Sequence, residues 1–212
     1  MRNELDFVIT KQMERTAAAL RRNRMLVDCV DSADEVVPLL RSLIGENDTI
    51  ASGRSATLEE CGVPDFFAAE RPGYIDRHAG KTPEERKSIS QNVAVADWFL
   101  ASANAITENG EIYQVDGHSS RIGPMVFGPK HVILVAGYNK IVPDLDAAKL
   151  RVERIAAPAN ARRQGSETPC AVTGVCQHCS SPGRICANTL ILSHQRIENR
   201  IRVILVKEIL GY

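Results

Sequence analysis

Short aliphatic runs alternate with amphipathic helical patterns along most of the chain. Residues 5–25 repeat apolar positions at helical spacing, and residues 25–30 then form a short strand pattern. The runs 97–102, 111–115 and 131–137 are rich in aliphatic residues and are bounded by Asn, Gly and Pro, which is typical of buried strands. Because short buried strands alternate with helices, the sequence predicts an α/β fold with a mainly parallel sheet.

Helix start and stop signals place two further elements. Thr82 followed by Pro83 and Glu85 is a capping pattern, so we expect a helix from there to about residue 96. Residues 146–157 are again helical in pattern, and Pro158 is expected to end that helix.

The composition changes between residues 161 and 188, a segment with almost no aliphatic residues and with four cysteines. The chain then returns to apolar strand patterns at 189–193 and 200–207. We therefore expect one α/β domain over residues 1–212, with 161–188 as a Cys-rich insertion between two sheet elements.

Bulk composition narrows the classes of partner. The 212 residues contain 26 Lys and Arg against 26 Asp and Glu, so the formal net charge is zero. Nothing in that balance favours nucleic acid or an anionic membrane as the main partner. The apolar runs are much shorter than the roughly 20 residues of a membrane-spanning helix, and the first residues lack a signal-peptide pattern. We expect a cytoplasmic protein without a membrane span.

The clustered cysteines have the spacing C-x5-C-x2-C-x6-C, formed by Cys170, Cys176, Cys179 and Cys186. Four thiolates in such a short segment predict a common metal centre, either tetrahedral Zn²⁺ or a [4Fe–4S] cluster, and the spacing does not choose between them. His178 could replace one cysteine as a zinc ligand. The alternative is that these are simple thiols, but a segment so poor in core residues needs some cross-link.

A glycine- and serine-rich turn follows the predicted strand at 49–53. Backbone N–H groups and hydroxyls at the start of a helix form an anion site, and an arginine adds a planar donor pair for phosphate or carboxylate. A plain strand-to-helix turn is an equally good interpretation. The candidate binding residues are Ser52, Gly53, Arg54, Ser55 and Thr57.

Polar side chains recur where later strands end, which is where α/β enzymes place their ligands. Glu108 and Asp116 are candidate general acid or base groups, and Lys140 is the third candidate catalytic residue. Turn chemistry favours another interpretation, in which Glu108-Asn-Gly and Asp116-Gly are turns, the first at the tip of a hairpin. The further candidate ligand-holding residues at these ends are Asn104, Arg121, Lys130 and Asn139.

Six sequence motifs carry a resemblance to a known family. These are SGRSATLEECG (52–62), NAITENGEI (104–112), VDGHSSR (115–121), GPK (128–130), GYNKIV (137–142) and AAPANA (156–161). In this order they resemble the LUD-domain family of the lactate-utilization protein C type, formerly a domain of unknown function. The cysteine motif resembles that of one branch of this family.

The resemblance implies a Rossmann-like, three-layer α/β domain of the kind shared by ribose-5-phosphate isomerase, glucosamine-6-phosphate deaminase and the CoA transferases. It also implies a component of L-lactate oxidation, a candidate oxidoreductase subunit that works beside iron–sulfur partner subunits and binds a lactate-like carboxylate. An oligomer is compatible with this.

Two other classes of function remain open. Residues 107–110 are similar to the Ser-Glu-Asn-Gly motif of CoA transferases, which would make Glu108 a nucleophile, and Asp116-Gly117 is similar to the Asp-Gly of pentose isomerases. The chain would then be a stand-alone enzyme on an acyl-CoA or a phosphosugar. A non-catalytic anion sensor with a structural zinc is the third possibility.

Overall fold

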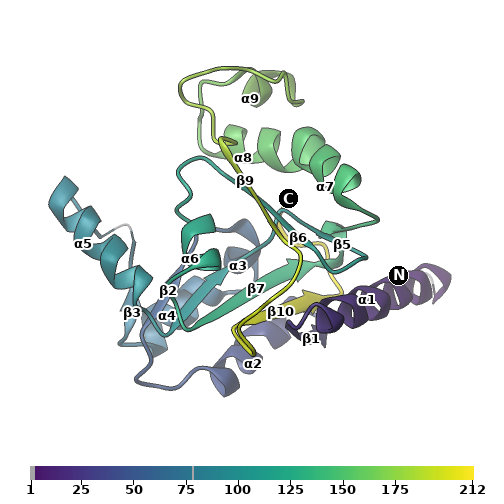
Figure 1. Ribbon diagram of the computed structural model, residues 1–212, viewed down its shortest axis with the longest axis horizontal. Coiled ribbons are helices and arrows are strands. Elements are labelled where there is room, and N and C mark those ends of the chain that lie inside the picture. The colour runs from purple at the N-terminus through teal and green to yellow at the C-terminus, as the bar shows by residue number, and fades with distance from the viewer. Residues whose placement is uncertain (1–2, 78) are drawn as a thin grey trace.

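The computed structural model describes residues 3–77 and 79–212, which form layers of helix and sheet around a six-stranded parallel sheet (Figure 1). Every neighbouring pair of strands described in it runs parallel. The central strands are continuous aliphatic runs because both of their faces are buried. In sheet order the strands are β1 (Leu26–Val30), β10 (Ile201–Val206), β7 (His131–Gly137), β4 (Trp98–Ala101), β2 (Ile50–Ser52) and β3 (Tyr74–Ile75).

Helices cover both faces of this sheet. One face packs against α2 (Val36–Leu43), α3 (Ala56–Glu60) and α4 (Val63–Glu70) through buried side chains such as Leu40 and Phe67. The other face packs against helices that contribute Met13, Val93 and Met125. These helices are α1 (Asn3–Arg22), α5 (Pro83–Ala94) and α6 (Ile122–Val126), and a short 3₁₀ turn (Ala33–Glu35) precedes α2.

The capping signal that predicted α5 is confirmed. The backbone N–H of Glu85 donates to Thr82 Oγ1 at 3.2 Å, and the Thr82 N–H donates to Glu85 Oε2 at 3.1 Å. These reciprocal bonds satisfy two N–H groups that a helix start would otherwise leave without a partner.

A second, four-stranded sheet lies over the first and was not predicted. Its strands, in the order β8-β5-β6-β9, are Ile141–Val142, Ala105–Thr107, Ile112–Asp116 and Asn188–Leu192. β6 pairs antiparallel with both β5 and β9, and β5 pairs parallel with β8. One face of this sheet contributes Ile106 and Ile112 to the main core, and the other packs Tyr113 and Val115 against a helical layer. The predicted α/β class with a mainly parallel sheet is confirmed, and layers are added on one side.

The helical layer corrects the prediction that Pro158 ends a helix. Helix α7 (Leu145–Arg151) continues through a π-helical turn (Val152–Ala156) into α8 (Ala157–Arg163), so Pro158 lies within the helix. The Ala157 N–H bonds the carbonyl five residues earlier, that of Val152. This wider turn accommodates the proline ring, which would clash with a carbonyl in a regular α-helix.

The Cys-rich segment runs from α8 to β9 and contains the short helix α9 (Pro169–Thr173). Figure 1 shows this segment at one end of the molecule, above α7 and α8, with β9 leading back from it toward the body. Among the residues that the structure describes, no helix is long and apolar enough to cross a membrane.

Candidate functional site

A cavity of about 310 Å³ lies where the loops after several strands meet. The loops after β2, β4 and β6 contribute to it, together with a 3₁₀ turn (Tyr138–Lys140) that follows β7. The parallel strands β2, β4 and β7 bring their carboxyl ends to one edge of the main sheet, and the loop after β6 of the second sheet meets them there. The predicted site residues that line the cavity are Ser52, Arg54, Ser55, Thr57, Asn104, Asp116, Arg121 and Lys140.

Three other predicted binding residues, Gly53, Asn139 and Lys130, do not line the cavity. Gly53 lies where the Arg121 side chain passes closely: a Cβ at position 53 would stand 2.7 Å from Arg121 Cγ. Asn139 Oδ1 accepts a hydrogen bond from the Leu210 N–H at 3.1 Å and so holds the C-terminal residues in place. Lys130, at the opposite end of β7, pairs with Asp97.

Glu108 is also outside the cavity. Its carboxylate accepts hydrogen bonds from Gln12 at 3.0 Å and from Arg15 at 3.0 Å, both on α1. The hairpin interpretation of residues 107–110 is confirmed, since Gly110 has φ of +81° and its N–H donates to the Thr107 carbonyl. The role of Glu108 as a nucleophile stays a prediction.

Lys140 is the most unusual group in the cavity. Its side chain is buried, and its amine donates to Thr57 Oγ1 at 2.6 Å and to Ser102 Oγ at 2.8 Å. In the described part of the chain, no carboxylate lies within ion-pairing distance of this amine. A buried ammonium without a counter-ion is costly, so the amine tends to lose its proton.

Burial therefore lowers the pKa of Lys140 to about 7, with the positive charge of Arg151 as the next cause. The Arg151 guanidinium donates to the carbonyls of Asn104 at 2.7 Å and Asn139 at 3.1 Å. It thus ties two strand-end loops together and also disfavours a proton on Lys140. An amine with a pKa near neutrality can both accept and donate a proton at physiological pH.

Asp116 organises the loop after β6. Its carboxylate accepts backbone hydrogen bonds from Arg121 at 2.8 Å and from His118 at 3.3 Å, and it forms an ion pair with Arg121 Nε at 3.4 Å. The Arg121 guanidinium also donates to the Val115 carbonyl at 2.8 Å. These contacts fix both side chains at the wall of the cavity.

Further basic and polar residues line the cavity that the sequence did not single out. Arg77 comes from the loop after β3, where its guanidinium donates to the Ser120 carbonyl at 2.8 Å. Arg163 and Asn160 come from α8, and the Tyr212 hydroxyl donates to Asn160 Oδ1 at 3.3 Å. Asn160 belongs to the motif at 156–161 that resembles the family, so the sequence held a signal from which it could have been predicted as a site residue. Because basic side chains outnumber carboxylates among the described lining residues, the cavity suits an anion.

The four clustered cysteines lie elsewhere, and all of them line a second cavity of about 150 Å³. Within residues 3–77 and 79–212, no three His, Cys, Asp or Glu side chains are arranged to hold one metal ion. The predicted metal centre therefore stays a prediction.

Comparison with known proteins gives the family. The chain is similar in fold to a crystal structure of a DUF162 family protein from Deinococcus radiodurans, with a TM-score of 0.53 and 14% identity over 93% of this chain and 98% of that one. A much weaker likeness, to eIF2B beta from Chaetomium thermophilum, has a TM-score of 0.36 and 12% identity over 53% of this chain and 43% of that one. The comparison with curated proteins gave no match. The LUD domain family model matches residues 13–206, and so the chain belongs to the LUD-domain family.

Proposed function

We propose that this LUD-domain protein binds a small carboxylate or phosphate in the strand-end cavity and acts on it as a component of L-lactate utilization. One observation carries the binding and proton-transfer part of the proposal. It is the buried amine of Lys140, held by two hydroxyls and facing a cavity bordered by arginines. An anionic ligand would supply the negative charge that this group lacks.

In this proposal the side chains that line the cavity have distinct roles. Arg54, which makes no ion pair among the described residues, and Arg77 present guanidinium groups for a planar anion. Lys140 accepts a proton from the bound molecule or returns one, since its pKa is lowered to about 7. Asp116 contributes a carboxylate to the cavity lining and is the second candidate group for proton transfer.

The choice of L-lactate utilization depends on the motif resemblance to the lactate-utilization protein C type. Membership in the LUD-domain family is consistent with this choice, and so is a basic cavity that suits an anion. Iron–sulfur partner subunits belong to the same proposal. Oxidation of L-lactate to pyruvate releases two electrons and two protons; the partner subunits would accept the electrons, and Lys140 would take up one of the protons.

Thermal unfolding with added anions tests the binding. We expect L-lactate, pyruvate or inorganic phosphate to raise the midpoint; a ligand at 100 times its dissociation constant adds about 2.7 kcal/mol. For a chain of this size that corresponds to roughly 5–10 °C. Arg121→Met and Lys140→Met should lose the shift, and Lys87→Met on the exposed surface of α5 should keep it. No shift with any of these anions would refute the binding proposal.

The cellular role needs a separate experiment. Deleting the gene in its source organism should stop growth on L-lactate and leave growth on glucose unchanged. Complementation with the wild-type chain should restore growth on L-lactate, and complementation with Lys140→Met should not. Normal growth of the deletion strain on L-lactate would refute the assignment to lactate utilization.

A phosphosugar is the second candidate ligand, favoured by the number of guanidinium groups around the cavity. In that case Asp116 is the proton-transfer group. Ribose 5-phosphate should then stabilise the protein more than L-lactate does, and Asp116→Asn should abolish its isomerisation as followed by the ketose product.

A further inference from the structure

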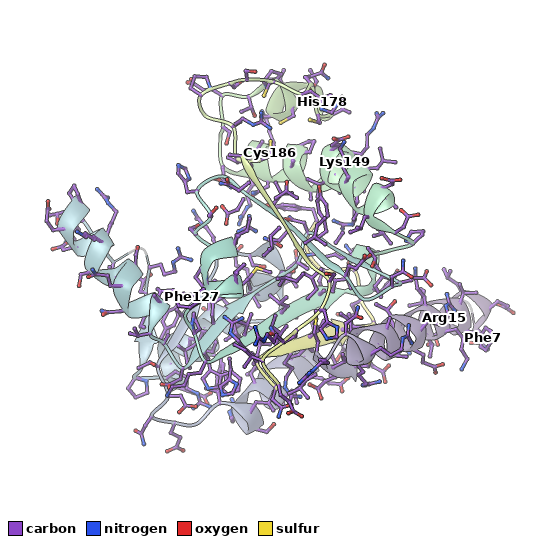
Figure 2. All side chains as sticks on the ribbon, in the orientation of Figure 1. Phe7, Arg15, Phe127, Lys149, His178 and Cys186 are labelled. Carbon is purple, nitrogen blue, oxygen red and sulfur yellow. The ribbon has the colours of Figure 1, made fainter. Side chains whose placement is uncertain are left out.

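The second cavity has an unusual lining. All four cysteines of the C-x5-C-x2-C-x6-C pattern border it, although they come from a segment with little secondary structure. The cavity lies against the outer face of the small sheet, at Tyr113 and Val115 of β6, and against the helical layer at Val152 and Ala157. In Figure 2, Cys186 and His178 mark this end of the molecule. The anion site uses none of these sulfurs.

Three of the four sulfurs have a hydrogen-bond partner in the described structure. The Cys170 sulfur lies 3.4 Å from Thr168 Oγ1, and the Cys176 sulfur accepts from the His178 N–H at 3.4 Å. Arg184 donates to the Cys186 sulfur at 3.5 Å. Donors aimed at sulfur stabilise negative charge there, as they do around metal-bound thiolates.

The same segment is fixed by its backbone. The Cys176 N–H donates to the Glu153 carbonyl at 3.0 Å, which anchors the C-x2-C turn to the π-helical turn. Arg184 donates to the carbonyls of Cys179 at 2.9 Å and Cys186 at 3.0 Å, so one guanidinium links two of the cysteines. A positive charge at this point offsets part of the charge of four thiolates.

The position of the four cysteines around a cavity favours a cluster over a single ion. Sulfurs bound to one tetrahedral Zn²⁺ lie about 2.3 Å from it, and so about 3.8 Å from one another. The described cysteines have no such arrangement, and instead stand around a cavity of about 150 Å³. A cubane cluster fills a space between its four cysteines, with each sulfur bound to a different iron.

We propose that Cys170, Cys176, Cys179 and Cys186 hold a [4Fe–4S] cluster in this cavity. The assignment uses none of the residues of the anion site, and of the two inorganic centres that the spacing left open it proposes the cluster.

The two cavities share a wall, which gives the cluster a specific place in the molecule. Ile185, next to the ligand Cys186, lines both cavities. The Ala187 N–H donates to the Asp116 carbonyl at 3.1 Å, and Asn188 Nδ2 donates to the Gly117 carbonyl at 3.2 Å. Gly117 packs so closely that a Cβ there would stand 3.2 Å from Ile185 Cα. The cluster would thus lie directly behind the loop that carries Asp116.

Metal and sulfide analysis of the full-length protein tests the proposal. Protein purified anaerobically, or reconstituted with Fe²⁺ and sulfide, should contain four iron and four sulfide per chain. It should show a broad visible absorption that dithionite bleaches, and an electron paramagnetic resonance signal after one-electron reduction. One zinc per chain without iron, or a protein that keeps all four thiols free under reconstitution, would overturn the proposal.

Variants locate the site. Cys176→Ser and Cys179→Ser should each lose most of the iron and the visible band, whereas Cys29→Ser, at an exposed cysteine of β1, should retain both. Circular dichroism shows whether each variant folds. If the serine variants do not fold, the iron and sulfide content and the resonance signal of the wild-type chain still decide the question. A cluster found in the wild type with no relation to the anion site would leave this inference standing even if the proposed function failed.

Discussion

Replacing Lys140 by methionine should change how stability depends on pH. The side chain is buried, and its pKa is lowered from 10.5 to about 7. Between these two values the unfolded chain binds a proton that the folded chain does not, so the stability of the wild type rises with pH. Below pH 7 both states are protonated and the cost of the buried charge is present in full. Methionine keeps the length and apolar character of the side chain and removes this dependence.

The magnitude follows from the two pKa values. Each unit of difference corresponds to about 1.4 kcal/mol, so a shift of this size costs the folded state on the order of 4–5 kcal/mol at neutral pH. Between about pH 7 and pH 9 the wild type should gain about 2 kcal/mol relative to Lys140→Met. The sign is the opposite of that for a lysine with an acidic partner, whose stabilisation is lost as the pH rises.

Urea unfolding at pH 7, 8 and 9 measures this difference. We expect the free energies of unfolding of the wild type and Lys140→Met to converge or cross as the pH rises, while the exposed control Lys87→Met stays parallel to the wild type. Parallel lines for Lys140→Met and the wild type would show that the amine titrates normally, and the argument from its burial would then be wrong.

Substitutions at three other positions test the packing and one helix cap. Gly53→Ala should cost about 1–3 kcal/mol and weaken anion binding, because its Cβ would collide with the Arg121 side chain; equal stability by urea unfolding would contradict this. Leu134→Ala, in the buried centre of β7, should cost about 2–5 kcal/mol by the same assay, and a cost below 1 kcal/mol would argue against the described core. Thr82→Ala should cost about 1 kcal/mol and speed amide exchange in the first turn of α5, whereas Thr82→Ser should be close to neutral.

The local sequence pattern was enough to predict those helices and strands whose position depends on neighbouring residues alone. The strand predicted at 131–137 is found at His131–Gly137, since a run of aliphatic residues between polar ends fits only a strand buried on both faces. The helix after Thr82 begins where its capping residues place it. The prediction that Pro158 ends a helix was wrong because a single π-helical turn accommodates the proline within the helix.

The hairpin of β5 and β6 explains why Glu108 lies away from the cavity that Asn104 and Asp116 line. Asn104 precedes β5 and Asp116 ends β6, so antiparallel pairing puts them at the same end, and Asn104 Oδ1 accepts from the Val115 N–H at 2.7 Å. Glu108 follows β5 and lies at the opposite end, beside α1. Sequence order lists all three as strand-end residues, and only the direction of pairing shows which of them share a cavity.

The sequence by itself determined the α/β class, the loops that carry polar residues, and the four cysteines as a group. Tertiary structure decided which of those loops meet, and it brought in residues such as Arg77 and Tyr212 that no local pattern marks. It also decided the state of Lys140, because the pKa of an amine depends on the water and charges that the fold removes or adds around it. Burial and proximity are properties of the whole packed chain, whereas strand, helix and turn preferences are written into short segments.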